Sequence, residues 1–373
     1  MRKISMEQLT PGMILARTLY SSDGKILLGA GITVSASFIE RLKKLGIPAV
    51  FIKDQLTDDL PIPQVIRESV RNATIKTVRD TFFRVQLLGE KGIDGREIKK
   101  AVSHLIDEII ANRHILIHMS DIRAYDDYTF GHSVNVAVLA TLTGLALGYN
   151  ELKLRDLACG ALLHDIGKMF VPIEILNKPG SLTDDEYKEI QKHSYYGFDV
   201  IRKKREDFSS LSAHVAFQHH ERFDGTGYPR GLHGNDIHEF ARIVAVADMF
   251  DALVADRVYR KGFLPYQAHE ILMAATSQHL DPSITQVFLQ NIAIYPIGSV
   301  VQLNTGAVGI VVDVNKLFQT RPVVRLIFSD EGKQLVEATE IDLTRHPTMF
   351  IHKLLTENET NLLLSCPKEE QSL

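Results

Sequence analysis

The stretch from about residue 113 to residue 290 is dominated by long helical patterns, and strand signals are scarce within it. Apolar residues that recur every three or four positions predict amphipathic helices. The segment 128–148 shows this rhythm, because Val136, Leu139 and Thr143 follow His132 at intervals of four, three and four. The pattern predicts an all-helical central body and places a histidine on the apolar face of one helix.

The segments on either side of this body have mixed or β-rich patterns. Residues 1–55 combine strand-like runs at 13–16, 25–28 and 49–52 with a turn signal at 21–24 and a helical segment at 35–45. Residues 296–346 contain β-rich runs at 300–303, 308–314 and 323–328. We therefore expect a mainly α chain with a small N-terminal α+β domain and a small C-terminal antiparallel β domain. The expected divisions are 1–55, a linker with amphipathic helices at 56–115, the helical body at 116–295, the β domain at 296–346 and a polar tail at 347–373.

The two amphipathic helices expected at 64–88 and 95–112 leave two interpretations open. Their apolar stripes fit a homodimer seam, and they fit packing on the core of the same chain equally well.

Charge and hydropathy exclude some classes of protein. Lys plus Arg number 42 against 46 Asp plus Glu, and this net charge of −4 lacks the basic excess typical of proteins that bind polymeric nucleic acid. The longest apolar stretch, 135–149, is shorter than the roughly 20 residues of a membrane span, so we expect a core helix and no membrane insertion. Cys159 and Cys366 form no disulfide framework, and we expect a cytoplasmic protein.

The histidines are the least usual feature of the composition, with 15 in all and eight between residues 132 and 238. One histidine on an apolar face is usually a hydrogen-bonded core residue, but several on separate helices beside acids favour metal binding. Imidazole and carboxylate together suit first-row transition metals. The set exceeds the needs of one ion, and two ions about 3.5–4 Å apart are the usual arrangement for phosphoester hydrolysis. The histidines concerned are His132, His164, His193, His219 and His220, and the acids on the same predicted inward faces are Asp165, Asp248 and Asp251.

Two motifs resemble known family signatures. The run His-Asp-Ile-Gly-Lys at 164–168 resembles the signature of the HD superfamily of metal-dependent phosphohydrolases. The run at 219–229, which includes Gly-Tyr-Pro, resembles the second signature of the HD-GYP subfamily. The resemblance covers about residues 120–280, and further matches lie in the expected order at 126–133, 192–193, 247–253 and 257–260.

This resemblance implies an all-helical HD-type domain that hydrolyses cyclic di-GMP to pGpG and, in a further step, to GMP. It implies two divalent transition-metal ions, with iron or manganese favoured and zinc or nickel left open. It matches one metal with His132, His164, Asp165 and Asp248, and the second with His193, His219 and His220, with Asp165 bridging the two.

Further residues match positions around the substrate. Lys168 matches the residue near the scissile phosphate, where an ammonium stabilises charge or donates a proton, and Asp165 shares the catalytic role. Arg257 and Arg260 match contacts to the substrate phosphates, and Tyr228 matches a contact to guanine or phosphate. The alternative for Lys168 is an ordinary surface lysine, and the alternative for the two arginines and Tyr228 is a purely structural role in a loop.

One position departs from the family pattern. Some family members hold a third metal through a Glu four residues before the histidine that matches His132, and Tyr128 stands at that position here. A phenol is a poor ligand, so we expect two metals, although Asp126 and Asp127 are alternative carboxylates.

Three functions stay open at this level. A phosphodiesterase for cyclic di-GMP is favoured, because all seven ligand candidates and Lys168 are present. A phosphodiesterase for another cyclic dinucleotide, such as cyclic GMP-AMP, is an alternative. The other alternative is a catalytically weak module that binds a cyclic dinucleotide or a signalling protein partner.

Overall fold

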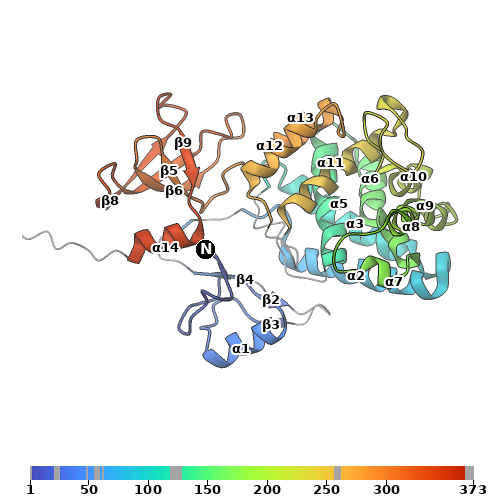
Figure 1. Ribbon diagram of the computed structural model, residues 1–373, viewed down its shortest axis with the longest axis horizontal. Coiled ribbons are helices and arrows are strands. Elements are labelled where there is room, and N and C mark those ends of the chain that lie inside the picture. Colours follow the sequence, from blue (N-terminus) through green and yellow to red (C-terminus); the bar gives the residue numbers. More distant parts are fainter. Residues whose placement is uncertain are drawn as a thin grey trace, which may run out of the picture. The chain divides into compact units, whose positions relative to one another are not determined.

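The computed structural model describes residues 2–20, 26–47, 49–53, 59–60, 63–117, 128–255 and 262–365. The chain divides into two compact units (Figure 1). One unit spans residues 64–292, and the other combines residues 1–63 with 293–373. The expected domain boundaries stay a prediction, and each unit is described here by itself.

The larger unit is helical, as the sequence predicts. Side-chain caps begin several of its helices: Asp94 caps α3, Asn150 caps α6, and Thr183 with Glu186 forms a capping box at the start of α8. In chain order the elements are α2 (Glu68–Leu88), η1 (Gly89–Gly92), α3 (Gly95–Ala111), α5 (Tyr128–Ala146), α6 (Glu151–Leu163), η2 (Ile166–Phe170), α7 (Ile173–Leu176), α8 (Asp184–Gln191), α9 (His193–Arg202), α10 (Ser210–Gln218), η3 (Gly234–Asp236), α11 (Glu239–Val254), α12 (Pro265–Ala275) and α13 (Pro282–Leu289).

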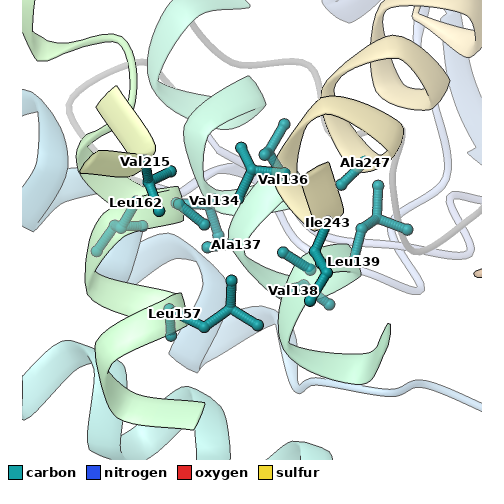
Figure 2. Packing of buried hydrophobic residues seen from close by; sticks show 14 of the residues in the cluster. Val134, Val136, Ala137, Val138, Leu139, Leu157, Leu162, Val215, Ile243 and Ala247 are labelled. Carbon is teal, nitrogen blue, oxygen red and sulfur yellow. The ribbon is translucent and has the colours of Figure 1, made fainter. Parts of the chain in front are cut away.

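Helix α5 lies at the centre of this unit. It packs against α6, α11 and α2, and its side chains interdigitate with Leu157 and Leu162 of α6 and Ile243 of α11 (Figure 2). The segment Thr129–Ala146 is long and apolar enough to cross a membrane, but 83% of it is buried inside the unit. A helix that is apolar all round and buried is typical of a protein core, which agrees with the prediction of a core helix.

Helices α2 and α3 also turn their apolar faces to this core. Phe82 and Val85 of α2 and Val102 and Ile109 of α3 are fully or almost fully buried in it. This favours packing on the chain's own core over a homodimer seam, and the homodimer stays a prediction.

In the smaller unit, the N-terminal residues form two short antiparallel pairs and one helix. β1 (Arg2–Ser5) pairs with β4 (Ala49–Ile52), and β2 (Leu19–Tyr20) pairs with β3 (Ile26–Leu28). The predicted helix is α1 (Ala36–Lys44), capped by the Ser35 side chain. The predicted strand at 13–16 forms only isolated bridges, at Ile14 and Leu15. The turn predicted at 21–24 lies outside the described residues.

The C-terminal residues form a five-stranded antiparallel sheet with the order β8-β7-β6-β5-β9. The three β-rich runs become β5 (Val300–Leu303), β6 (Val308–Asp313) and β7 (Val323–Phe328), while β8 (Gln334–Asp342) and β9 (Ile351–Leu354) were not expected. The segment predicted as a polar tail instead contains β9 and α14 (Glu357–Ser365). α14 begins with a reciprocal cap, in which Thr356 and Glu359 each accept a backbone N–H of the other, and β9 pairs with β5.

Candidate metal centre

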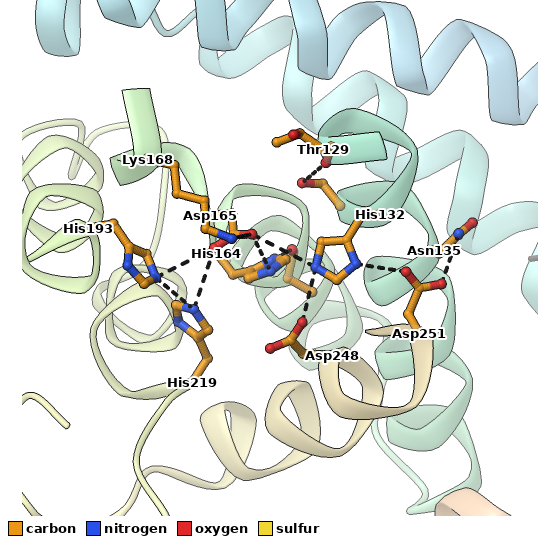
Figure 3. A network of polar contacts seen from close by, with 12 residues as sticks. Thr129, His132, Asn135, His164, Asp165, Lys168, His193, His219, Asp248 and Asp251 are labelled. Atoms are coloured by element: carbon orange, nitrogen blue, oxygen red, sulfur yellow. Dashed lines mark hydrogen bonds and ion pairs between the residues drawn. The ribbon is translucent and has the colours of Figure 1, made fainter. Parts of the chain in front are cut away.

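The centre of the site is Asp165, which follows the last turn of α6. Its carboxylate is almost fully buried, and its two oxygens face opposite sets of histidines (Figure 3). Oδ2 lies 3.4 Å from His164 Nε2 and 3.8 Å from His132 Nε2. Oδ1 lies 3.6 Å from His193 Nε2 and 3.8 Å from His219 Nε2. One carboxylate therefore belongs to two groups of nitrogen donors.

The first group joins α5, α6 and α11. His132 Nε2 lies 3.0 Å from Asp248 Oδ1, and His132 Nδ1 lies 2.7 Å from Asp251 Oδ2. Burial opposes the charged form of His132, but hydrogen bonds to Asp248 and Asp251 raise its pKa well above its ordinary value. Both ring nitrogens of His132 thus face carboxylate oxygens, an arrangement that favours positive charge at this position.

His164 completes this group from the C-terminal end of α6. Its Nδ1 donates to the carbonyl of Ala161 at 2.7 Å, which turns Nε2 towards Asp165. Among the described residues, His164 Nε2 and Asp165 Oδ1 are buried atoms without a hydrogen-bond partner. Buried polar atoms are rarely left unpaired, so both atoms fit a metal ligand set.

The second group comes from the ends of α9 and α10. His193 Nδ1 lies 2.6 Å from the carbonyl of Ile190, and His219 Nδ1 lies 3.0 Å from that of Ala216. Each contact leaves Nε2 facing the site, as outer-shell hydrogen bonds do in metal sites. Burial lowers the pKa of His193 to about 3 and lowers the pKa of His219 and His220. All three imidazoles are therefore neutral near pH 7, the form that binds metals.

The ligand atoms of each group lie within 4.8 Å of one another. One group holds Asp165, His193, His219 and His220, and the other holds His132, His164 and Asp165. Asp248 joins the latter through its contact with His132. The structure thus brings all seven sequence candidates together, and the donor set of imidazoles and carboxylates fits divalent transition metals.

The helical element η2 approaches α9 closely, and this approach depends on Gly167. A Cβ atom at Gly167 would lie 1.9 Å from the carbonyl oxygen of His193 and 2.5 Å from Gly197 N. Only glycine therefore allows the Asp165 segment and the His193 segment to meet.

Lys168 lies at the edge of the site. Its Nζ is 2.6 Å from Asp165 Oδ2, and its side chain is 30% exposed while Asp165 is almost fully buried. Burial would raise the pKa of Asp165, but Lys168 and then His164 hold it well below its ordinary value. The Lys168 ammonium thus lies between the buried carboxylate and solvent.

The Gly-Tyr-Pro loop covers the second group. The Tyr228 ring stacks on His220 with centroids 4.8 Å apart, and the Tyr187 ring of α8 meets Tyr228 edge-on at 6.4 Å. Glu221 holds the loop by accepting backbone N–H groups of Arg230 and Leu232 at 2.8 and 2.9 Å. Tyr228 therefore lies beside the candidate metal ligands, and its contact to a substrate stays a prediction.

Several predicted residues lie outside the described part of the chain. These are Arg257, Arg260, Asp126 and Asp127, and the side chain of Tyr128 is also not described. Their predicted roles stay predictions.

Two side chains near the site were missed at the sequence level. Asn135 lies one turn after His132 on α5 and donates to Asp251 Oδ1 at 3.0 Å. The signal for Asn135 was its spacing of three residues from a candidate ligand. Arg71 of α2 donates to Asn135 Oδ1. No local signal marks Arg71, because it lies 64 residues before Asn135 in the chain.

Comparisons with known proteins agree with this geometry. The HD domain family matches residues 105–284, and the "KOW domain associated with HD domain" matches residues 300–363. A cyclic di-GMP phosphodiesterase of Pseudomonas aeruginosa is 36% identical over 290 residues, which cover 76% of this chain and 69% of that protein.

Two further relatives differ in the substrate that they are named for. The cyclic di-GMP phosphodiesterase response regulator RpfG of Xanthomonas campestris is 31% identical over 68% of this chain and 71% of its own length. A 3'3'-cGAMP-specific phosphodiesterase of Vibrio cholerae is 35% identical over 44% of this chain and 31% of its own length. With the HD motif, the Gly-Tyr-Pro loop and this similarity together, the chain belongs to the HD-GYP family of HD-domain proteins.

Proposed function

We propose that the protein is a cytoplasmic metal-dependent phosphodiesterase that hydrolyses cyclic di-GMP to pGpG and onward to GMP. One observation carries the proposal: Asp165 is shared by two groups of buried donors, which suits a pair of ions. The HD-GYP relatives support a phosphodiesterase and a cyclic dinucleotide substrate. The relative specific for cyclic GMP-AMP keeps that substrate as the second candidate.

The seven candidate residues would hold two divalent ions, with Asp165 between them. Such ions, when bound, supply positive charge to phosphoryl oxygens and lower the pKa of water near them. The protein's part is to hold the ligands rigidly, since the Nδ1 contacts of His132, His164, His193 and His219 fix four of the five rings.

Lys168 would act on the leaving side of the reaction. Its ammonium lies beside the shared carboxylate and is partly open to solvent. It is placed to stabilise charge on the phosphate and to donate a proton to the departing ribose oxygen. Tyr228 would contact the nucleotide over the second group, and Arg257 and Arg260 would contact its phosphates.

The substrate is tested by comparing kcat/KM for a panel of cyclic dinucleotides with protein loaded with Mn²⁺ or Fe²⁺ under reducing conditions. We expect the highest value for cyclic di-GMP, with pGpG and then GMP as products. A higher kcat/KM for cyclic GMP-AMP would show that the proposed substrate is wrong, while the proposed phosphodiester hydrolysis would stand. If the metal-loaded protein binds a cyclic dinucleotide tightly but does not hydrolyse it, the proposed enzymatic activity is wrong and a binding module is favoured.

A further inference from the structure

A chain of hydrogen bonds connects α2 with the first group of metal-ligand candidates. Arg71 of α2 donates through Nη1 to Asn135 Oδ1, and Asn135 Nδ2 donates to Asp251 Oδ1 at 3.0 Å. Asp251 Oδ2 lies 2.7 Å from His132 Nδ1, and His132 Nε2 faces Asp248. Figure 3 shows the part of this chain from Asn135 to Asp248.

We propose that Arg71 is a positioning residue of the metal centre, which acts on His132 through Asn135 and Asp251. The inference rests on the proposed metal-dependent function and extends it to α2, a helix outside the residues 105–284 that the HD domain family matches.

The donors and acceptors along this chain allow one arrangement. Arg71 can only donate, so the Asn135 amide has its oxygen towards Arg71 and its nitrogen towards Asp251. Asp251 then accepts a hydrogen from His132 Nδ1. This contact fixes the His132 ring with Nε2 facing the site, as outer-shell hydrogen bonds do for metal-ligating imidazoles.

Burial makes this chain costly to interrupt. Arg71 is 6% exposed, Asn135 8%, His132 6% and Asp251 1%. A buried guanidinium is strongly unfavourable unless hydrogen bonds and opposite charge compensate it. Without the Arg71 donor, the Asn135 oxygen loses the contact that sets the orientation of the amide, and this weakens the contact that orients Asp251 towards His132.

The test compares Arg71→Met, Arg71→Lys and Arg84→Met in the full chain. Arg84 is the matched control, because it lies on the same helix but bonds to the Gly92 carbonyl at 3.1 Å and to Glu97. The affinity for Mn²⁺ alone is measured from the electron paramagnetic resonance signal of the free ion, after bound metal has been removed with a chelator. Circular dichroism of the metal-free proteins reports whether each one is folded.

We expect Arg71→Met to weaken Mn²⁺ binding by about 10- to 100-fold, the usual effect of losing an outer-shell partner. Arg71→Lys, which keeps one donor, should lose less, and Arg84→Met should bind as the wild type does. In an Asp251→Asn background the effect of Arg71→Met should shrink, because the connection is already broken. A residue with only a structural role would give additive effects.

A folded Arg71→Met protein that binds Mn²⁺ as tightly as the wild type would overturn the inference. If Arg71→Met does not fold, Arg71→Lys decides the question: weaker Mn²⁺ binding supports the inference, and unchanged binding overturns it. Failure of the proposed function is separately visible, since the wild type would then bind Mn²⁺ without cleaving any cyclic dinucleotide. A wild type that does not bind Mn²⁺ would overturn both.

Discussion

Replacing Gly167 by alanine tests whether the close approach of η2 and α9 builds the site. The new Cβ atom would lie 1.9 Å from the carbonyl oxygen of His193, and an ordinary contact needs at least 3.4 Å. The two segments must therefore separate by about 1.5 Å, whereas metal–ligand distances tolerate only about 0.2 Å. We expect His193 to leave its group, with loss of bound metal and with overpacking that costs about 1–3 kcal/mol of stability.

Metal content per chain and thermal unfolding with and without chelator measure the two parts of this prediction. Two glycines serve as matched controls. A Cβ atom at Gly197 would lie 3.3 Å from its nearest neighbour, the Ala216 methyl, and one at Gly29 would lie 3.8 Å from Ile32. Gly197→Ala should have a mild effect and Gly29→Ala almost none. A Gly167→Ala protein with wild-type metal content and stability would refute the reasoning.

Three further predictions concern Lys168, His164 and the buried Cys159. Lys168→Met should keep the bound metal but lower kcat by about 10²- to 10⁴-fold, the usual contribution of a general acid; unchanged kcat would remove Lys168 from the mechanism. His164→Ala should abolish hydrolysis, whereas His214→Ala, which removes a half-buried histidine beside Phe198, should leave it intact; equal losses would indicate a general effect on folding. Burial raises the pKa of Cys159 to about 12, so the folded chain should keep this thiol protonated and unreactive to iodoacetamide at pH 9–10. In the unfolded chain the thiol ionises from about pH 9, so the free energy of unfolding should fall as pH rises from 9 to 12. Urea titrations of Cys159→Ala should show no such fall from this position.

Several ligand candidates could be found from the sequence because they interrupt apolar patterns. His132 lies on the apolar face of a helix, and the adjacent His164 and Asp165 end an almost uncharged run. Buried polar groups at such positions need a compensating partner, which indicates that they bind a metal ion or contact one another. The family motifs then added the grouping around Asp165 that the structure shows in space.

Other features depend on tertiary contacts and left no local signal. Arg71 lies within an amphipathic helix and resembles any surface arginine until Asn135 meets it from α5. β1 pairs with β4, almost 50 residues later, so no short-range pattern predicts it. α14 had a readable signal in its Thr356 and Glu359 cap, which the polar composition of the tail concealed.

The central claim is that Asp165 joins two metal ions in one centre. Its most direct test is the number of metal ions per chain in anaerobically purified wild type and in the Asp165→Ala variant. We expect two ions per chain in the wild type and fewer than one in the variant, because both groups lose their shared oxygen ligand. A wild type with no ion, one ion or three tightly bound ions would contradict the account, and so would an Asp165→Ala protein that retains two.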